Sequence, residues 1–255
     1  MGFLKRLLKR IGFRGKLIKI FVESTHFLEG KGRHVIWTTL RPWMVEGYLR
    51  KSEIRKLQLG TGLNILDSWL NSDIFPKSLK VIYLNAKRVF PFNDYSFDYI
   101  FSEHQIEHLS YLEGKRMLEE SFRILKPGGV IRIATLSLES LIELYGRKKT
   151  EIQLRYIKRI IDKFLPEIGI YDECFVINNA FRGWGHQFIY DRKILKGVFE
   201  EAGFVDIQEL GSGESLDENL RNIEKHGEFI GDEEVNRMQT IVFEAKRPGR
   251  EKGYY

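Results

Sequence analysis

The stretch LQLGTGLNILDSWLNSDIF, residues 57–75, begins with a short apolar run that leads into the Gly-Thr-Gly of residues 60–62. Ten residues separate this loop from Asp73. A glycine-rich loop after a strand, with an acidic residue at the end of the next strand, is typical of sites that hold nucleotide cofactors. A crossover between parallel strands normally takes about a dozen residues or more. No full helix fits here, and we expect Trp69 to fill its space.

Strand and helix patterns alternate outward from this stretch. Short apolar runs predict central strands, and longer amphipathic runs predict helices. The expected strands are Lys56–Leu59, Trp69–Ile74, Lys80–Asn85, Phe97–Ser102, Val130–Thr135, Val205–Leu210 and Met238–Ala245, and the expected helices are Leu112–Leu125, residues 138–168 and Arg192–Ala202. This alternation predicts a layered α/β domain with a mostly parallel sheet.

We divide the chain into three parts. Residues 1–52 form a basic amphipathic arm and a helical lead-in, residues 53–248 the main domain, and residues 249–255 a tail. The main domain carries a helical and lid insertion at about 138–190. Its last part, FVINNAFRGWGHQFIYD, is rich in aromatic residues and punctuated by glycine, as expected of a loop that closes over a site. A polar connection joins the last two strands.

Composition places the chain among soluble globular proteins, with 43% hydrophobic and 30% charged residues in a length of 255. The single cysteine, Cys174, excludes an internal disulfide framework and a multi-cysteine zinc site, which fits a reducing compartment. No run of about 18 uncharged apolar residues is present, so the sequence predicts no membrane-spanning helix. We therefore expect a cytoplasmic protein.

The basic charge is concentrated at the start of the chain. Residues 1–19 hold seven Lys and Arg side chains and no acid, and the remainder has 34 Lys and Arg against 35 Asp and Glu. Apolar and basic residues fall on opposite sides of this arm, as in helices that lie on an anionic membrane surface, here the inner membrane face. The arm could instead pack on the body or on another subunit. The near-neutral body speaks against a nucleic-acid partner.

A series of motifs in register gives the strongest indication of function. KLQLGTG, SWLNSDIFP, FPFNDYSFDYIFSEHQIEHL, RILKPGGVIRIATLS, GWGHQFIYD, EEAGF, GES and TIVFEAKRP follow one another. In order and spacing they resemble the class I S-adenosylmethionine-dependent methyltransferases, and most closely a short-loop group whose members often resemble glycan or polysaccharide-biosynthesis enzymes. The resemblance covers about residues 55–248. It implies a Rossmann-like three-layer α/β sandwich around a mostly parallel seven-stranded sheet whose last strand is antiparallel.

The resemblance also implies where S-adenosylmethionine binds. Gly60, Thr61 and Gly62 would approach the methionine part of the cofactor, and Asp73 would bind the ribose hydroxyls. Asn85 stands where the family typically has an acid that meets the adenine amine, and its side-chain carbonyl can still accept that hydrogen bond. The candidate cofactor-binding residues are Gly60, Thr61, Gly62, Asp73, Ile74, Asn85, Ala86 and Glu103.

The cluster HQIEH, residues 104–108, matches the H-x-x-E-H pattern of a zinc peptidase. A metallopeptidase would need it inside a helix with a further ligand, whereas here it straddles the end of a strand and the start of a helix. In the methyltransferase resemblance, Glu103 and His104 lie where open α/β sheets place ligands. His104, Glu107 and His108 could hold a divalent metal, or the Glu-His pair could cap and pack the turn. We take His104 as a candidate catalytic residue and expect no metal.

His186 is the second candidate catalytic residue. It lies in the expected lid, between Trp184 and Phe188. A neutral imidazole there could take the proton of an acceptor hydroxyl, or it could be hydrogen-bonded within a packed loop.

These features together predict methyl transfer from S-adenosylmethionine to a hydroxyl or carboxyl group. The acceptor would be a small molecule or a glycan, such as a lipid-linked sugar at a membrane surface. The alternative is a membrane-associated scaffold or regulatory protein whose methyltransferase-like body does not catalyse. A nucleic-acid methyltransferase is disfavoured because the fourth strand is not followed by an N/D-P-P-Y-like signature.

Overall fold

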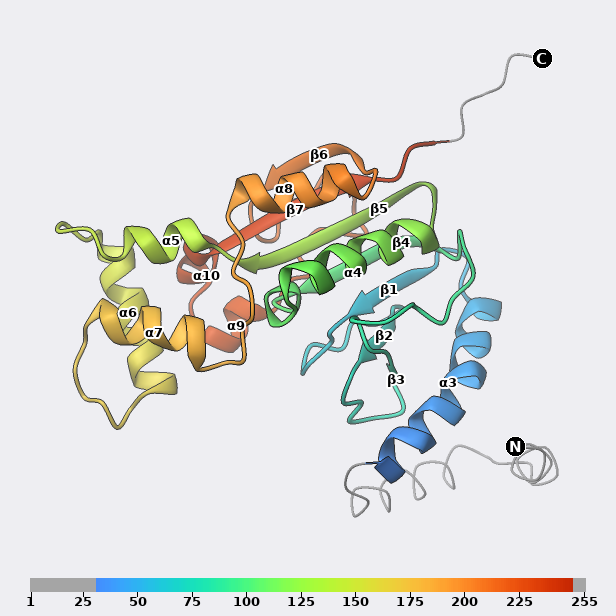
Figure 1. Cartoon of the computed structure of the whole chain (residues 1–255), viewed down its shortest axis with the longest axis horizontal. Coiled ribbons are helices and arrows are strands. Elements are labelled where there is room, and N and C mark those ends of the chain that lie inside the picture. Colours follow the sequence, from blue (N-terminus) through green and yellow to red (C-terminus); the bar gives the residue numbers. More distant parts are fainter. Residues whose placement is uncertain (1–30, 250–255) are drawn as a thin grey trace.

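Seven strands form one sheet within residues 31–249, the part of the chain that this computed structural model describes (Figure 1). Their order is β3-β2-β1-β4-β5-β7-β6, and only the two pairs that involve β7 are antiparallel. The strands are β1 (Lys56–Leu59), β2 (Leu70–Asp73), β3 (Val81–Tyr83), β4 (Phe97–Glu103), β5 (Leu125–Leu136), β6 (Val205–Leu210) and β7 (Thr240–Lys246). This confirms the expected fold class, a Rossmann-like α/β fold with a mostly parallel sheet and an antiparallel last strand.

The helices gather on one face of the sheet and beyond one end of it (Figure 1). They are α3 (Lys31–Lys51), α4 (Tyr111–Ile124), α5 (Leu138–Glu143), α6 (Glu151–Phe164), α7 (Glu173–Arg182), α8 (Arg192–Glu201), α9 (His226–Ile230) and α10 (Glu233–Gln239). Among residues 31–249, no helix has the length and apolar content to cross a bilayer. The basic arm, residues 1–19, lies outside the described residues.

One face of the sheet packs against α4 and α8. Alternate strand residues point to this face, as the period of two in a strand requires. The fully buried members from the strands include Leu57, Leu59, Ile100, Ile131 and Ile133, which form one cluster with Met117, Leu118, Leu195 and Phe199. Helix α4 begins with a capping box: the Ser110 hydroxyl accepts from the Glu113 amide, and the Glu113 carboxylate accepts from the Ser110 amide.

The opposite face carries no helix between β1 and β2, because residues 60–69 form turns. Trp69 is 7% exposed there and packs edge-on against Phe101, with ring centroids 6.2 Å apart, as expected for a residue that fills this space. Leu220, from the connection of residues 211–225, completes the cluster. On this face the covering layer is therefore an irregular segment.

Arg132 holds that segment down from the middle of β5. Its guanidinium is fully buried and donates to Glu224, to Glu244 at 2.6 Å and to the carbonyl oxygen of Glu214 at 2.8 Å. Burying a charge is unfavourable unless its partners are present, so this network ties residues 211–225 to the sheet.

Two expectations about the connections were wrong. The first half of the expected lid loop is helix α7, whose N-cap Asp172 accepts from the amide of Cys174 and whose Val176 and Ala180 are buried one turn apart. The polar connection before the last strand contains α9 and α10. Both are short, and their apolar residues are too few to show a helical period in the sequence.

Candidate active site

Three adjoining cavities lie at the carboxyl ends of β1, β2 and β4, where ligands bind in open α/β sheets. We call them the Asp73 cavity, of about 420 Å³, the Leu63 cavity, of about 620 Å³, and the histidine cavity, of about 240 Å³. His104 lines all three, while Gly60 and Gly62 line the first two. The three spaces are therefore parts of one site with His104 at their meeting point.

The glycine loop, residues 60–62, follows β1 directly and lies next to the carboxyl end of β2. Gly60 and Gly62 have φ angles of +67° and +53°, which residues with a Cβ rarely adopt. The amide of Gly62 donates to Asp73 Oδ2 at 2.9 Å, and the amide of Phe75 donates to Asp73 Oδ1 at 2.8 Å. These bonds fix the Asp73 carboxylate at the edge of the cavity. Each oxygen keeps a lone pair for a further donor.

The two glycines serve different purposes. A Cβ at Gly62 would meet no atom within 4 Å, so the space beside it is open. A Cβ at Gly60 would lie 2.2 Å from Cγ of Gln105, so this glycine makes room for a side chain of the protein. Next to them, Thr61 Oγ1 is buried and has no hydrogen-bond partner within residues 31–249.

The Asp73 cavity is lined on its far side by Ile74, Asn85 and Ala86. The Asn85 side-chain oxygen accepts from the amide of Lys87 at 2.9 Å, so its orientation is set by the loop after β3. The structure thus brings together Gly60, Gly62, Asp73, Ile74, Asn85 and Ala86 in one space.

Thr61 and Glu103 line the Leu63 cavity instead. The Glu103 carboxylate accepts from the amides of Lys225 at 3.0 Å and His226 at 2.9 Å. Burial raises the pKa of Glu103, although the charge of His104 and these amides act in the opposite direction. Glu103 therefore has a role not foreseen in the sequence: it fixes the start of α9.

His104 and Glu107 form a buried pair below the histidine cavity. His104 Nδ1 lies 2.8 Å from Glu107 Oε1, and Thr135 donates to Glu107 Oε2 at 2.9 Å. Because a carboxylate only accepts hydrogen bonds, Nδ1 of His104 carries a proton. His104 has a φ angle of +45°, which turns its ring away from the line of β4. Nε2 of the ring lies 3.4 Å from the Thr240 hydroxyl.

His104 and Glu107 shift each other's pKa in the direction that favours the ionised pair. Burial raises the pKa of Glu107, but the hydrogen bond and charge of His104 outweigh it and lower the pKa to about 2. Burial lowers the pKa of His104, whereas the hydrogen bond and charge of Glu107, with the charge of Glu103, raise it, and the net shift is upward. Glu107 is therefore a carboxylate that favours a proton on His104.

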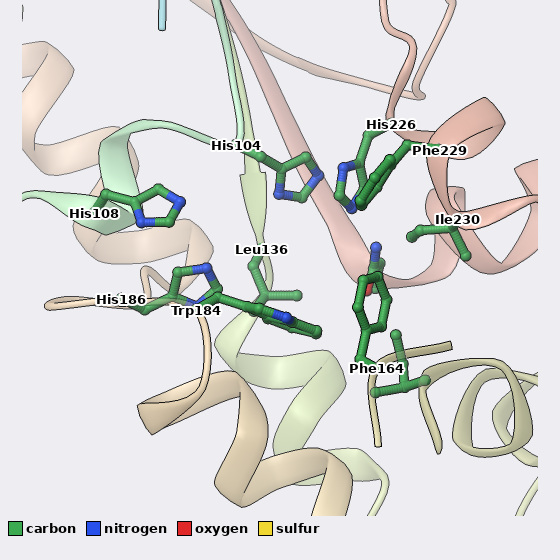
Figure 2. A pocket seen from close by; sticks show the side chains of 11 residues that line it. His104, His108, Leu136, Phe164, Trp184, His186, His226, Phe229 and Ile230 are labelled. Atoms are coloured by element: carbon green, nitrogen blue, oxygen red, sulfur yellow. The ribbon is translucent and has the colours of Figure 1, made fainter. Parts of the chain in front are cut away.

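His226 is a site residue that the sequence did not reveal. Its ring stacks on His104 with centroids 3.7 Å apart and planes tilted by 32°, as Figure 2 shows. Burial and the neighbouring charge of His104 lower the pKa of His226 to about 2, so its imidazole is neutral. Phe229 follows one turn later on α9 and also lines the cavity. Their only signal in the sequence was a histidine and an aromatic residue within a polar connection.

His186 faces the same cavity from the loop after α7 (Figure 2). Its Nδ1 lies 2.7 Å from the carbonyl oxygen of Ala180, so Nδ1 carries the proton and Nε2 keeps its lone pair. Burial lowers the pKa of His186, which keeps the ring neutral. His108 lies edge-on to it at 4.8 Å. The structure thus brings both candidate catalytic residues, His104 and His186, into one cavity.

Within residues 31–249, no group of three or more His, Cys, Asp and Glu side chains is arranged to hold a metal ion. His104, Glu107 and His108 belong to the strand end and the 3-10 turn Ile106–His108, with Glu107 directed to His104 and Thr135.

Part of the chain is similar to known methyltransferases. Residues 60–133 match the family model described as a methyltransferase domain. The demethylmenaquinone methyltransferase of two Staphylococcus epidermidis strains is 30% identical over 135 residues, which are 51% of this chain and 49% of that protein. The chain thus aligns with about half the length of these curated relatives.

Solved structures of methyltransferases are also similar. A SAM-dependent methyltransferase from Archaeoglobus fulgidus has a TM-score of 0.44 and 20% identity, with 89% of this chain and 99% of that chain covered. Another, from Thermotoga maritima, has a TM-score of 0.46 and 14% identity, with 85% and 95% covered. No conclusion about substrate follows from likenesses of this size.

The family match is confined to residues 60–133 and is to a methyltransferase domain, a kind of domain whose cofactor is S-adenosylmethionine. Three features of the site fit that cofactor: the open space beside Gly62, the unpartnered hydroxyl of Thr61 and the lone pairs of the fixed Asp73 carboxylate. The residues present therefore suit a ligand that carries ribose hydroxyls and an amino-acid end.

Proposed function

We propose that the protein transfers a methyl group from S-adenosylmethionine to a hydroxyl group of a small acceptor. Asp73 would bind the ribose hydroxyls, Ile74, Asn85 and Ala86 would border the adenine, and Thr61 and Gly62 would adjoin the methionine part. The acceptor would occupy the histidine cavity. The observation that carries this proposal is that His104 lines all three cavities, so an acceptor in the histidine cavity would lie beside the cofactor.

The chain's own residues do two things in this reaction. When bound, the cofactor supplies a methyl group on a positively charged sulfur. The cavity walls would hold the acceptor beside that methyl group, and such positioning lowers the barrier because the entropy cost of bringing the reactants together is met on binding. His104 or His186 then accepts the proton of the hydroxyl at Nε2, because Nδ1 of each ring is already hydrogen-bonded to an acceptor.

A hydroxyl fits this cavity better than a carboxyl. No Asp, Glu, Lys or Arg is among the residues that line it, so no Lys or Arg there neutralises a carboxylate or a phosphate. A sugar on a lipid carrier would bring many hydroxyls and a charged linkage to walls that are mostly aromatic and aliphatic. A glycan acceptor is therefore the alternative that the acceptor experiments compare with a small hydroxyl compound.

A second candidate function is a methyltransferase-like protein that binds but does not catalyse. Gln105 packed against Gly60 and the Asn85 oxygen already engaged by Lys87 are the observations that favour it. Binding of S-adenosylhomocysteine without turnover on any hydroxyl acceptor would support this candidate over the enzyme.

We propose further that the arm of residues 1–19 anchors the protein on an anionic membrane. The seven basic side chains of the arm support this, since each Lys or Arg near such a surface contributes about 1 kcal/mol. Vesicles containing anionic lipid should sediment the full chain but not a version that lacks residues 1–19. Equal sedimentation of both would contradict the proposal.

Calorimetric titration with S-adenosylhomocysteine tests the proposed cofactor site. We expect the intact chain to bind and Asp73→Ala to bind at least about 10-fold more weakly. Asp67→Ala is the matched control, because Asp67 is an exposed acid in the same segment. Equal affinity of the Asp73 variant, with an unchanged melting temperature, would reject the assigned site.

A further inference from the structure

We propose that the acceptor is an uncharged phenol, a single aromatic ring whose hydroxyl faces the histidines. This inference rests on the proposed function and names the substrate class of the same site. Four observations on the histidine cavity carry it: the shape of its walls, its volume, its lack of charge and the chemistry of its imidazoles.

The walls form an aromatic corner. The rings of Phe164 and Trp184 meet edge to face with centroids 5.1 Å apart, and Phe164 lies 5.9 Å from Phe229. In Figure 2 Trp184 lies beside His186 and Phe229 beside His226, so aromatic rings and imidazoles alternate around the cavity. Flat apolar faces of this kind favour an aromatic ligand, because aromatic pairs stack offset or edge to face at these separations.

The volume of the cavity suits one ring. At about 240 Å³ it is smaller than the usual ligand cleft of roughly 300–1,000 Å³. An engineered apolar cavity of about 150 Å³ is known to bind benzene. The space therefore takes a single ring with small substituents, and not a disaccharide or a fused polycycle.

Charge opposes an anionic acceptor. Behind the cavity, Glu107 is fully buried and ionised, and Glu103 lies one residue before His104 in the chain. Lys163 lies outside the lining set: its ammonium donates to the carbonyl oxygen of Phe229 and sits 4.3 Å from that ring. An acceptor carrying a carboxylate or phosphate would lie near the buried Glu107 carboxylate, which already balances a proton on His104, and no Lys or Arg lines the cavity.

The imidazoles match a phenolic proton. A phenol ionises near pH 10, whereas an aliphatic hydroxyl is closer to water, on the order of 16, so an imidazole removes the phenolic proton far more readily. In the reaction the phenol oxygen forms a bond to the methyl carbon as the carbon–sulfur bond breaks. The electron pair of that bond stays on sulfur, which becomes a neutral thioether. The proton passes to Nε2 of His104 or His186 and then to solvent.

An acceptor panel tests the inference with the full chain and S-adenosylmethionine. The matched pair is 4-methylphenol and 4-hydroxybenzoate, which differ chiefly in charge, together with a methyl hexoside and benzoate. Release of S-adenosylhomocysteine is measured. We expect kcat/KM for 4-methylphenol to exceed that for each of the others by at least 10-fold. Faster methylation of the hexoside or of either carboxylate overturns the inference, and so does the absence of any phenol methylation.

Two cavity variants make the test specific. Phe164→Ala should raise KM for 4-methylphenol about 10-fold, while Phe181→Ala, an exposed ring on α7, should leave it unchanged. Lys163→Met should leave that KM unchanged, as should Lys158→Met, which removes an exposed lysine one turn earlier. A 10-fold rise of KM in Lys163→Met alone would show that the acceptor is an anion, which contradicts the inference.

Calorimetry distinguishes a failure of the proposed function from a failure of the phenol inference. If the chain does not bind S-adenosylhomocysteine, the proposed function itself fails. If it binds and methyl transfer goes to a sugar hydroxyl, the proposed function holds and the phenol inference fails alone. Transfer to a carboxylate would contradict both the hydroxyl acceptor and the phenol inference, while the cofactor site would still stand. Melting temperatures of all variants show whether a loss reflects unfolding.

Discussion

The imidazoles of His104 and His226 stack with their centroids 3.7 Å apart, one at the end of β4 and the other at the start of α9. Two charged rings at this separation would repel each other strongly. The Glu107 carboxylate raises the pKa of His104, whereas burial and the charge of His104 keep His226 neutral. In this stack His104 can therefore take a proton, whereas His226 stays neutral.

The first prediction concerns acid stability. In the folded protein the pKa of His226 is about 2, against 6.5 in the unfolded chain, under the influence of burial and of His104, Glu107, Lys163 and His186. Below pH 6.5 the unfolded state therefore binds one more proton, and stability falls as pH falls. One proton is worth about 1.4 kcal/mol per pH unit, so about 2 kcal/mol is lost between pH 6.5 and 5.

Urea unfolding at several pH values measures this effect. His226→Gln should flatten the fall in the free energy of unfolding by about one proton over that range. The same slope in the variant and the parent chain would show that His226 does not stay neutral in the fold.

The second prediction concerns the pH dependence of methyl transfer. Glu107→Gln keeps an oxygen for His104 Nδ1 and an amide for the Thr135 hydroxyl, but it removes the charge. Burial still lowers the pKa of His104, so without Glu107 that pKa should fall. The acidic limb of the kcat/KM profile should move to lower pH, and its plateau should drop by at least about 10-fold because the base is weaker.

A purely structural role of Glu107 would give a different profile. The plateau would drop while the limb stayed in place. Thr135→Val, which removes only the hydroxyl that donates to Glu107, is the control for local packing.

The third prediction separates backbone strain from lost space in the site. Gly62 and Gly128 both have positive φ angles, and a Cβ at either position meets nothing within 4 Å, but only Gly62 lines a cavity of the site. Each Gly→Ala change should cost about 1–2 kcal/mol of stability. We expect Gly62→Ala alone to weaken S-adenosylhomocysteine binding, by about 10-fold in calorimetry. Equal affinities in the two variants would place the cofactor elsewhere.

The fourth prediction concerns the buried network at Arg132. Arg132→Met leaves Glu224 and Glu244 without their cation, and removing one partner of a buried ion pair costs about 3–5 kcal/mol. Arg50→Met, which breaks an exposed pair with Glu46, should cost about 0.5 kcal/mol or less. Denaturant unfolding measures both. Similar losses in the two variants would show that the network does not hold the second face of the sheet.

Much of the fold follows from local patterns in the sequence. Strands β1 and β6 begin and end where expected, because each is a short run with apolar residues at nearly every second position and is followed by a glycine. The absence of a helix after Gly62 followed from counting residues, and Trp69 is buried on the face where that helix would have packed. The length of the connection between β1 and β2, and the alternation of side chains in a strand, were sufficient for these conclusions.

Less of the site could be predicted from the sequence, because contacts between residues far apart in the chain form half of it. Asp73 and the glycine loop are close in sequence, and the pattern places them together. His226 and Phe229 reach the cavity only because Glu103 accepts from the first amides of α9 and Arg132 holds the segment before it. Gln105 against Gly60 is another such contact, and no local pattern encodes these pairings.

A crystal structure of the full chain with S-adenosylhomocysteine would show whether Asp73 and the glycine loop hold the cofactor beside the histidine cavity. We expect the ribose hydroxyls of the bound molecule to lie within hydrogen-bond distance of the Asp73 carboxylate. Its amino-acid end should lie beside Thr61 and Gly62, and its sulfur should face His104 and the histidine cavity. A cofactor bound away from Asp73, or with its sulfur turned from the histidine cavity, would contradict this expectation.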